Sequence, residues 1–295
     1  MTPDPMYPQP YPYRPPVGSD PTDPLISADF SGWWQRGFRL VKAAWRPMAI
    51  IQLIAGVPAL ALLVPGLVHF SRQQQDMQAQ FEASTTAGQP DVSLLFTGLG
   101  LLLPLAAVAG LIYLVGQLAT AQVVVLTATG RTGNLVGPAL ATAVKRVPPA
   151  LGWYLLALPL AILATVLCFL PVVYVGAVLM VLPIVVLVER GNGIGRCFQL
   201  FHTDLGVSVS RIATVAGLSF AGGIVLSLLT TIITLTIGGG LGAQNATATV
   251  INTVLQGVLT GVSGVVLTPL IVATYADLRA RRELFTTATL RDAPA

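Results

Sequence analysis

The sequence has very little charge for its length. Only 9% of its 295 residues are Asp, Glu, Lys or Arg, whereas 54% are hydrophobic and the mean hydropathy is +0.76. A soluble domain carries about 25% charged residues, because water must solvate its surface. The deficit excludes an ordinary water-soluble domain and predicts that lipid surrounds much of the chain. The net charge of +4 comes from cations beside apolar runs, which is typical of membrane orientation, so nucleic acid is not an expected partner.

Cysteine and histidine are scarce as well. The chain has two of each, Cys168, Cys197, His69 and His202, with neither a disulfide framework nor metal-ligand spacing. No metal or other cofactor is therefore expected, and both cysteines are interpreted as small hydrophobic residues. The first 28 residues are rich in Pro and Tyr and lack an apolar signal segment, which predicts a disordered tail and no cleavable signal peptide.

Four long stretches contain no charged residue. They cover 47–71, 92–130, 147–188 and 212–276. A membrane-spanning helix needs about 20 apolar residues, so these stretches have room for six to eight spans. They lack the alternating polarity of barrel strands, which excludes a transmembrane β-barrel.

The positions of Lys and Arg select six spans. Basic segments before the first span, at 131–146, at 189–211 and after the last span all lie inside if the chain crosses six times. Fifteen of the sixteen Lys and Arg residues then lie on the cytoplasmic side, and Arg72 alone lies outside. We therefore predict an all-α, multi-pass protein of the plasma membrane with both termini in the cytoplasm.

The predicted organisation is one membrane domain between two short tails. The domain covers 29–285, and disordered cytoplasmic tails cover 1–28 and 286–295. Pro171 is expected to separate the third and fourth spans, and the glycines at 238–240 the fifth and sixth. The expected spans are about 48–69, 94–127, 150–169, 172–188, 212–236 and 248–276.

The segment before the first span has the periodicity of an interfacial amphipathic helix. Between Asp29 and Arg46, apolar residues recur every three or four positions and cations take another face. Four cations beside an anionic leaflet contribute about 4 kcal/mol, at about 1 kcal/mol each. The apolar positions are Phe30, Trp34, Phe38, Val41 and Trp45. The candidate contacts to anionic lipid are Arg36, Arg39, Lys42 and Arg46, together with Arg196 in a later segment.

Two further segments resemble this one. Residues 196–200 (Arg-Cys-Phe-Gln-Leu) match residues 36–40 (Arg-Gly-Phe-Arg-Leu), and 134–147 is a weaker copy. The pattern predicts a threefold repeat of an interfacial helix followed by a transmembrane hairpin, with a coincidental match as the alternative. Repeats of this kind also occur in transporters.

The spans contain polar residues but no charged residue in their apolar bodies. A charge in the bilayer centre marks proton relays and ion pathways, so its absence argues against an ion-coupled pump. The amides either join helices by hydrogen bonds or line a solute path. They are Gln52, Gln117, Gln122, Asn252 and Gln256.

Charged pairs stand at the cytoplasmic ends of two spans. Glu189 with Arg190, and Asp277 with Arg279, are the candidate ion-pair network or head-group site, and ordinary interfacial charge is the alternative. His202 is close to an acidic residue in sequence, but no nucleophile or metal ligand stands near it, so no catalytic residue is assigned.

Three stretches resemble a known family of bacterial membrane proteins, the membrane domain of glycerophosphoryl diester phosphodiesterases. They are 34–41 (Trp-Gln-Arg-Gly-Phe-Arg-Leu-Val), 188–200 from the Val-Glu-Arg-Gly-Asn-Gly step onward, and 269–283 with its Tyr-x-Asp-Leu-Arg-x-Arg signature. The resemblance covers about 29–285, and the Pro/Tyr-rich tail is similar to those of many actinobacterial members. It implies a membrane module without catalysis, because family members with phosphodiesterase activity carry a separate soluble catalytic barrel that this chain has no room for.

The expected function is therefore a non-enzymatic scaffold or accessory module of the cell envelope. Its expected partners are a bilayer with anionic head groups and proteins that bind the amino-terminal tail. The main alternative is a transporter or channel-like carrier of a neutral or lipidic solute, and a lipid-phosphodiester enzyme is the third. The oligomeric state stays open.

Overall fold

The computed structural model describes residues 20, 22–83, 93–167, 169–237 and 246–291. Within these residues every regular element is an α-helix. The elements are α1 (Phe30–Ala83), α2 (Ser93–Ala128), α3 (Val136–Leu167), α4 (Phe169–Leu179), α5 (Leu182–Val188), α6 (Gly193–Phe201), α7 (Leu205–Ile237), α8 (Ala246–Arg282) and α9 (Thr287–Arg291).

Six helical stretches are long and apolar enough to cross a bilayer: α1, α2, α3, α4 together with α5, α7 and α8. Large apolar side chains on them face outward, among them Leu53, Phe220 and Leu228 at 64%, 72% and 60% exposure. Exposed side chains of this kind are compatible with lipid as the solvent and not with water. The predicted fold class, an all-α membrane protein with six spans, is confirmed.

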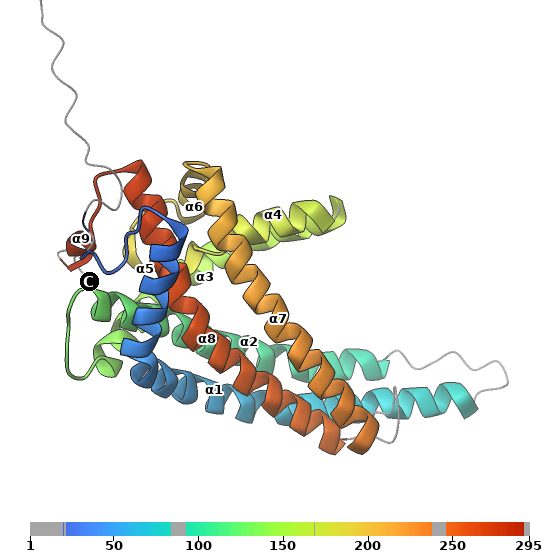
Figure 1. Cartoon of the computed structure of the whole chain (residues 1–295). Helices are drawn as coiled ribbons and strands as arrows, with labels where there is room; N and C mark the ends of the chain where they lie inside the picture. Colours follow the sequence, from blue (N-terminus) through green and yellow to red (C-terminus); the bar gives the residue numbers. More distant parts are fainter. Residues whose placement is uncertain (1–19, 21, 84–92, 168, 238–245, 292–295) are drawn as a thin grey trace, which may run out of the picture.

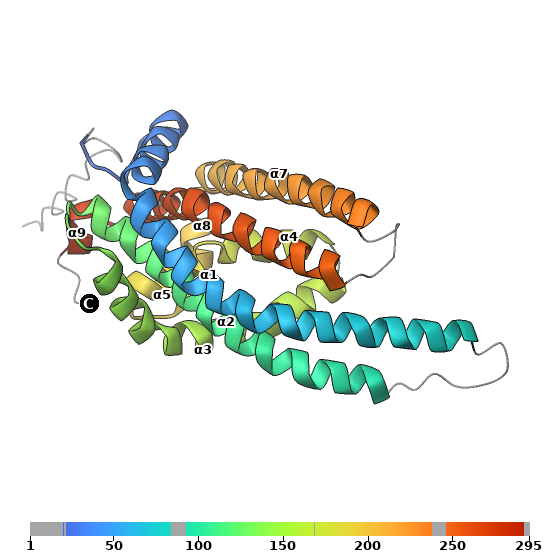
Figure 2. The same cartoon turned by 90° about the horizontal axis from the view of Figure 1, so that it is seen from below.

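The helix ends differ from the predicted spans. The amphipathic segment before the first span is not a separate interfacial helix, because α1 is continuous from Phe30 through the expected span 48–69 to Ala83. Figures 1 and 2 show that α1 changes direction in its amino-terminal half. Pro47 lies within α1 and cannot donate a backbone hydrogen bond, so it is the natural cause of this bend.

Other spans begin or break at unexpected places. Helix α3 starts at Val136 rather than near 150, and the fourth span is divided into α4 and α5 at Met180 and Val181. Pro171 lies in the first turn of α4, where a missing N–H costs little, instead of between two helices. The glycines at 238–240 lie outside the described residues.

Both predicted tails are partly folded. Leu25 and Ile26 are buried in the main core, and Phe285 and Leu290 close the same core from the other end of the chain. The described parts of the predicted tails, around Leu25 and Leu290, are therefore packed with the helical core. The remainder of each tail, 1–19 and 292–295, lies outside the described residues, as does Pro21.

The spans form three hairpins, α1–α2, α3–α4 and α7–α8. Helices α7, α8, α1 and α2 lie side by side in that order, as Figure 2 shows, and consecutive members are in contact. The α3–α4 hairpin stands apart from α7 over much of its length (Figure 1). The amphipathic segments precede the three hairpins in α1, α3 and α6, and the threefold repeat stays a prediction.

Small residues let the membrane helices approach closely. A Cβ atom built on Gly116 of α2 would lie 2.7 Å from Cβ of Ala55 on α1. On the other side of α1, Gly257 and Gly264 of α8 face Leu60 and Gln52. The amide of Gln52 on α1 donates to Oγ1 of Thr120 on α2, 3.0 Å away. Of the two roles considered for the amides, Gln52 therefore has the first, which is to join helices by a hydrogen bond.

Replacing Gly116 with Ala should destabilise the fold, because the Cβ of Ala55 is held by its helix and cannot move aside. Overpacking of this kind costs about 1–3 kcal/mol. Gly110 on the same helix has open space around it, so Gly110→Ala is the matched control and should be neutral or slightly stabilising. Thermal unfolding in detergent measures both, and equal midpoints for the two variants would contradict the packing described.

Candidate functional site

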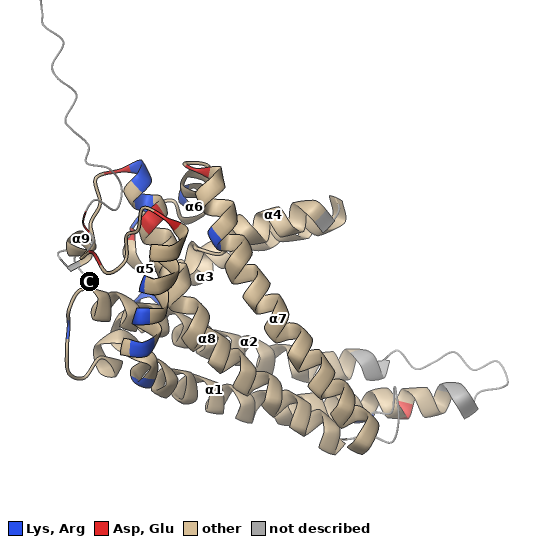
Figure 3. Ribbon diagram, in the orientation of Figure 1, with Lys and Arg blue, Asp and Glu red and all other residues tan. Residues whose placement is uncertain are grey.

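Charged side chains gather at one end of the helix bundle, where residues 22–29, α5, α6 and α9 also lie (Figure 3). We call this the charged end. The three sequence stretches singled out above, 34–41, 188–200 and 269–283, all have residues there. In the part of the chain that the structure describes, two ion-pair clusters occupy this end.

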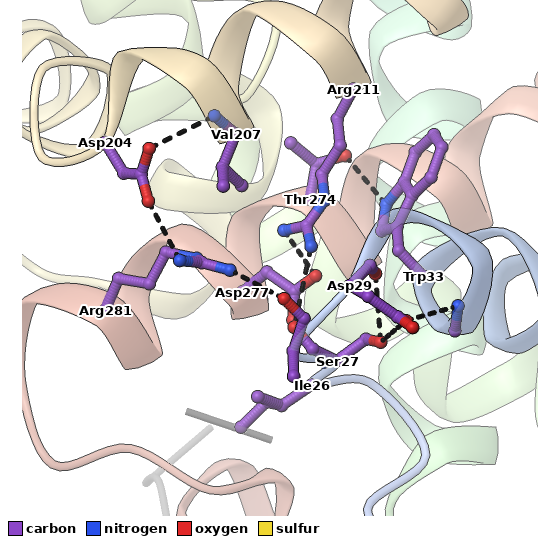
Figure 4. Close-up of polar contacts among 12 residues, drawn as sticks. Ile26, Ser27, Asp29, Trp33, Asp204, Val207, Arg211, Thr274, Asp277 and Arg281 are labelled. Atoms are coloured by element: carbon purple, nitrogen blue, oxygen red, sulfur yellow. Dashed lines mark hydrogen bonds and ion pairs between the residues drawn. The ribbon is translucent and has the colours of Figure 1, made fainter. Parts of the chain in front are cut away.

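The first cluster is built on an ion pair between Arg211 of α7 and Asp277 of α8. Both residues are buried, at 1% and 0% exposure, and a guanidinium nitrogen contacts Oδ2 of the carboxylate. The other carboxylate oxygen accepts the backbone N–H of Ser27 at 2.5 Å (Figure 4). A buried carboxylate is stable only with such compensation, so the pair fixes α7, α8 and Ser27 relative to one another.

An aromatic wall completes this cluster. Trp33 of α1 is fully buried, and its ring centre lies 5.9 Å from the guanidinium carbon of Arg211. Its indole N–H donates to Oγ1 of Thr274 on α8 at 3.1 Å (Figure 4). The cation is thus stabilised by a ring as well as by a carboxylate.

Residues 23–29, which we call the strap, are held by further contacts along their length. Arg281 of α8 donates to the carbonyl of Ala28 at 3.1 Å and to the carboxylate of Asp204 at 2.8 Å (Figure 4). Asp204 also caps the start of α7, because its carboxylate accepts the backbone N–H of Val207. At the other end of the strap, Asp23 accepts the backbone N–H and the hydroxyl of Thr287, at 3.0 and 2.6 Å.

The second cluster joins α6 to the end of α8. The guanidinium of Arg196 bridges Glu189 and Glu283, with both N–O distances at 2.8 Å. Arg279 pairs with Glu283 one turn away and lies 3.9 Å from Glu189. The hydroxyl of Tyr275 donates to Glu189 at 2.7 Å and accepts from Arg279 at 2.9 Å.

The charges of this cluster oppose the effect of burial. Burial alone would raise the pKa of Glu283, but the hydrogen bond and charge of Arg279, with the charge of Arg196, hold that pKa below its ordinary value. Glu283 therefore stays ionised at neutral pH.

The predicted network residues divide between the two clusters. Glu189 and Arg279 meet in the second cluster, whereas Asp277 belongs to the first and does not pair with Arg279 as expected. The reason is helical geometry, because Asp277 and Arg279 are two positions apart and project from different faces of α8. Arg190 is exposed beyond the end of α5.

The predicted lipid contacts also divide. Arg39, Lys42 and Arg46 are exposed and Arg36 is half-buried, so the first three remain free to face head groups. Arg196 is not such a group, because Glu189 and Glu283 occupy its guanidinium. The prediction for Arg196 rested on the match of residues 196–200 to residues 36–40.

Arg211, Trp33 and Arg281 were not among the predicted site residues, and Asp204 was considered only as a partner of His202. One signal could have found the central pair. Arg211 and Asp277 are the two charged residues that bound the charge-free stretch 212–276. A stretch that forms one hairpin must bring its two ends to the same membrane face.

Within the described residues, His202 contacts Tyr174 and Phe198 and not the nearby Asp204. One ring nitrogen lies 3.1 Å from the hydroxyl of Tyr174 and the other 2.8 Å from the carbonyl of Phe198, while Asp204 pairs with Arg281 instead. Among the described residues there is no group of three His, Cys, Asp or Glu side chains that could hold a metal.

Comparison with known proteins gave no match to a protein-family model, a curated protein or a solved structure. What the chain does must therefore be inferred from its own residues.

Removing both charges of the central pair should cost less than the sum of the costs of removing each one. Asp277→Asn keeps an oxygen for the N–H of Ser27 but leaves Arg211 buried without a counter-charge, which costs about 3–5 kcal/mol. Arg211→Gln should cost a similar amount, and the double variant should be more stable than the sum of the two losses implies. Strictly additive shifts in thermal unfolding would show that the two charges do not depend on each other.

Cys197 of α6 should resist thiol reagents in the folded protein. It is fully buried, and burial followed by the charge of Glu189 raises the pKa of its thiol to about 12. Thiolate, the reactive form, is therefore negligible at neutral pH. In a Cys168→Ala background, maleimide should label Cys197 only after the chain is unfolded in detergent, and rapid labelling of the native protein would refute its burial.

Proposed function

We propose that this chain is a non-enzymatic scaffold of the cell membrane that holds its Pro/Tyr-rich amino-terminal segment at a fixed point for protein partners. The observation that carries the proposal is the fixation of the strap. Ser27 and Ala28 bond to α8 through their backbone, and the side chain of Asp23 bonds to α9. A loosely attached tail would need none of these bonds.

In this proposal the charged end faces the cytoplasm, and both termini are on that side of the membrane. The distribution of Lys and Arg supports that orientation. Arg39, Lys42 and Arg46 lie exposed on α1 beside the half-exposed ring of Trp45, an arrangement suited to an anionic leaflet. At about 1 kcal/mol per cation, the three contribute about 3 kcal/mol to this contact.

We also propose kinship with the membrane domain of glycerophosphoryl diester phosphodiesterases. In support, the four distinctive residues of the Tyr-x-Asp-Leu-Arg-x-Arg stretch all lie in the two clusters. Tyr275 bonds to Glu189, Asp277 to Arg211, Arg279 to Glu283 and Arg281 to Asp204. Their roles are structural, which supports a module without catalysis.

A carrier of a neutral or lipidic solute is the second candidate, and one feature favours it. A groove of about 1090 Å³ separates α4 from α7 and is lined by apolar and small side chains, including Val173, Ala177, Ala216 and Gly223. Its lining suits an acyl chain better than a hydrophilic solute.

The orientation can be tested with two cysteine reporters. Asp76 and Arg282 are both exposed, so a cysteine at either position is accessible from its own side. In intact cells, an impermeant reagent should label the cysteine of Asp76→Cys and should reach that of Arg282→Cys only after lysis. The reverse pattern would overturn the orientation.

The scaffold role predicts that partners depend on both the tail and the strap. Proteins cross-linked to the full chain in native membranes should be lost when residues 1–19 are deleted. They should also decrease for Arg281→Gln, which frees Ala28 and Asp204, but not for Arg282→Gln, the neighbouring arginine outside the strap contacts. Limited proteolysis should cut the strap in Arg281→Gln but not in Arg282→Gln.

Two results would refute the scaffold role. One is a partner set that is unchanged by the deletion. The other is transport of a labelled lipid or hydrolysis of a glycerophosphodiester by the purified chain in liposomes.

A further inference from the structure

Helix α8 has two exposed faces of opposite character. One face carries Val254, Val258 and Val262, which are 42%, 55% and 53% exposed, as expected for a surface in lipid. The other face carries polar residues at a four-three-four-three spacing, and Gln256 and Thr260 among them are exposed. Its members are Thr249, Thr253, Gln256, Thr260 and Ser263.

This polar face borders a pocket of about 230 Å³ between three helices. Leu60, Leu63 and Leu67 of α1 form an apolar wall, and α2 contributes Tyr113. Thr253, Gln256 and Thr260 of α8 form the polar wall, and Gly257 lies between them. No charged residue lines the pocket.

The pocket lies in the part of α8 that is far from the charged end. Gln256 is ten residues from Ala246 at one end of α8 and twenty-one residues from Asp277 at the charged end. At 1.5 Å per residue these separations are about 15 Å and about 31 Å along the helix. The two separations add to about 46 Å, which exceeds the roughly 30 Å of a hydrocarbon core, so Gln256 lies toward the end of the core opposite the charged end.

Two hydrogen-bonding groups of this pocket lack a protein partner. The hydroxyls of Thr253 and Thr260 donate to carbonyls of their own helix, at 2.7 and 2.8 Å. Within the described residues, neither the Gln256 amide nor the Tyr113 hydroxyl has a hydrogen-bond partner. Unpaired polar groups are costly in hydrocarbon, and the valine face shows that α8 can present apolar side chains to lipid.

We propose that this pocket binds an uncharged lipid through a carbonyl or hydroxyl group. Tyr113 supplies an O–H donor and Gln256 supplies both a donor and an acceptor, while the leucines of α1 accommodate an apolar body. A charged head group does not fit, because no cation is present to offset its desolvation. The site is independent of the scaffold role, which depends on the charged end.

Photo-crosslinking in nanodiscs tests the site with the full chain. The probe is a diacylglycerol with a diazirine in its acyl chain, and the comparison probe is a phosphatidylglycerol with the same chain. Diacylglycerol should label α1, α2 and α8 around the pocket, with the leucines of α1 next to the acyl chain, and phosphatidylglycerol should not. Gln256→Leu should reduce that labelling about five-fold and Tyr113→Phe about two- to five-fold, as expected for the loss of single hydrogen bonds.

Val258→Leu, on the opposite exposed face of α8, is the matched control and should leave the labelling unchanged. Tyr113→Phe removes one oxygen atom and so reports on the site even if Gln256→Leu unfolds the protein. Equal labelling by both probes, or labelling indifferent to Gln256 and Tyr113, overturns the proposal. Cross-links between two copies that disappear in Gln256→Leu, with lipid labelling unchanged, also overturn it, because a second copy would then occupy this face.

Discussion

A guanidinium and a carboxylate that are buried together where two membrane helices end can neither separate nor exchange partners cheaply. Arg211 and Asp277 form such a pair, and the rest of the charged end depends on it. The pair sets the register of α7 against α8, and its free carboxylate oxygen holds Ser27. Trp33, which covers the cation, brings the start of α1 to the same place. Three stretches distant in sequence thus meet at one ion pair.

The six spans could be predicted from the sequence because lipid imposes a simple constraint on charge. A stretch without charged residues, bounded by cations on the cytoplasmic side, has few ways to cross a bilayer. The constraint says nothing about where a helix begins in water or in protein. That is why α1 and α3 start before their expected spans, and why the folded parts of the tails, around Leu25 and Leu290, were missed.

The candidate site was only partly predictable for a different reason. Sequence proximity suggested Asp277 with Arg279, whereas their partners come from other helices. Arg279 reaches Glu189 and Glu283, and Asp277 reaches Arg211, 66 positions earlier in the chain. Opposite charges at the two ends of a charge-free hairpin were the usable signal. The signal is not general, because Glu189, which ends the stretch begun after Arg146, pairs with Arg196 instead.

The cost of the buried pair bears on what the charged end is for. Apolar residues of similar size in place of a buried ion pair often leave stability unchanged or improve it, so stability alone does not account for Arg211 and Asp277. An ion pair differs from apolar packing in demanding one geometry. With the N–H of Ser27 as a third member, that geometry fixes the strap as well as the two helices. The proposed scaffold role would use this geometry to hold the amino-terminal segment at a defined point beside the bilayer.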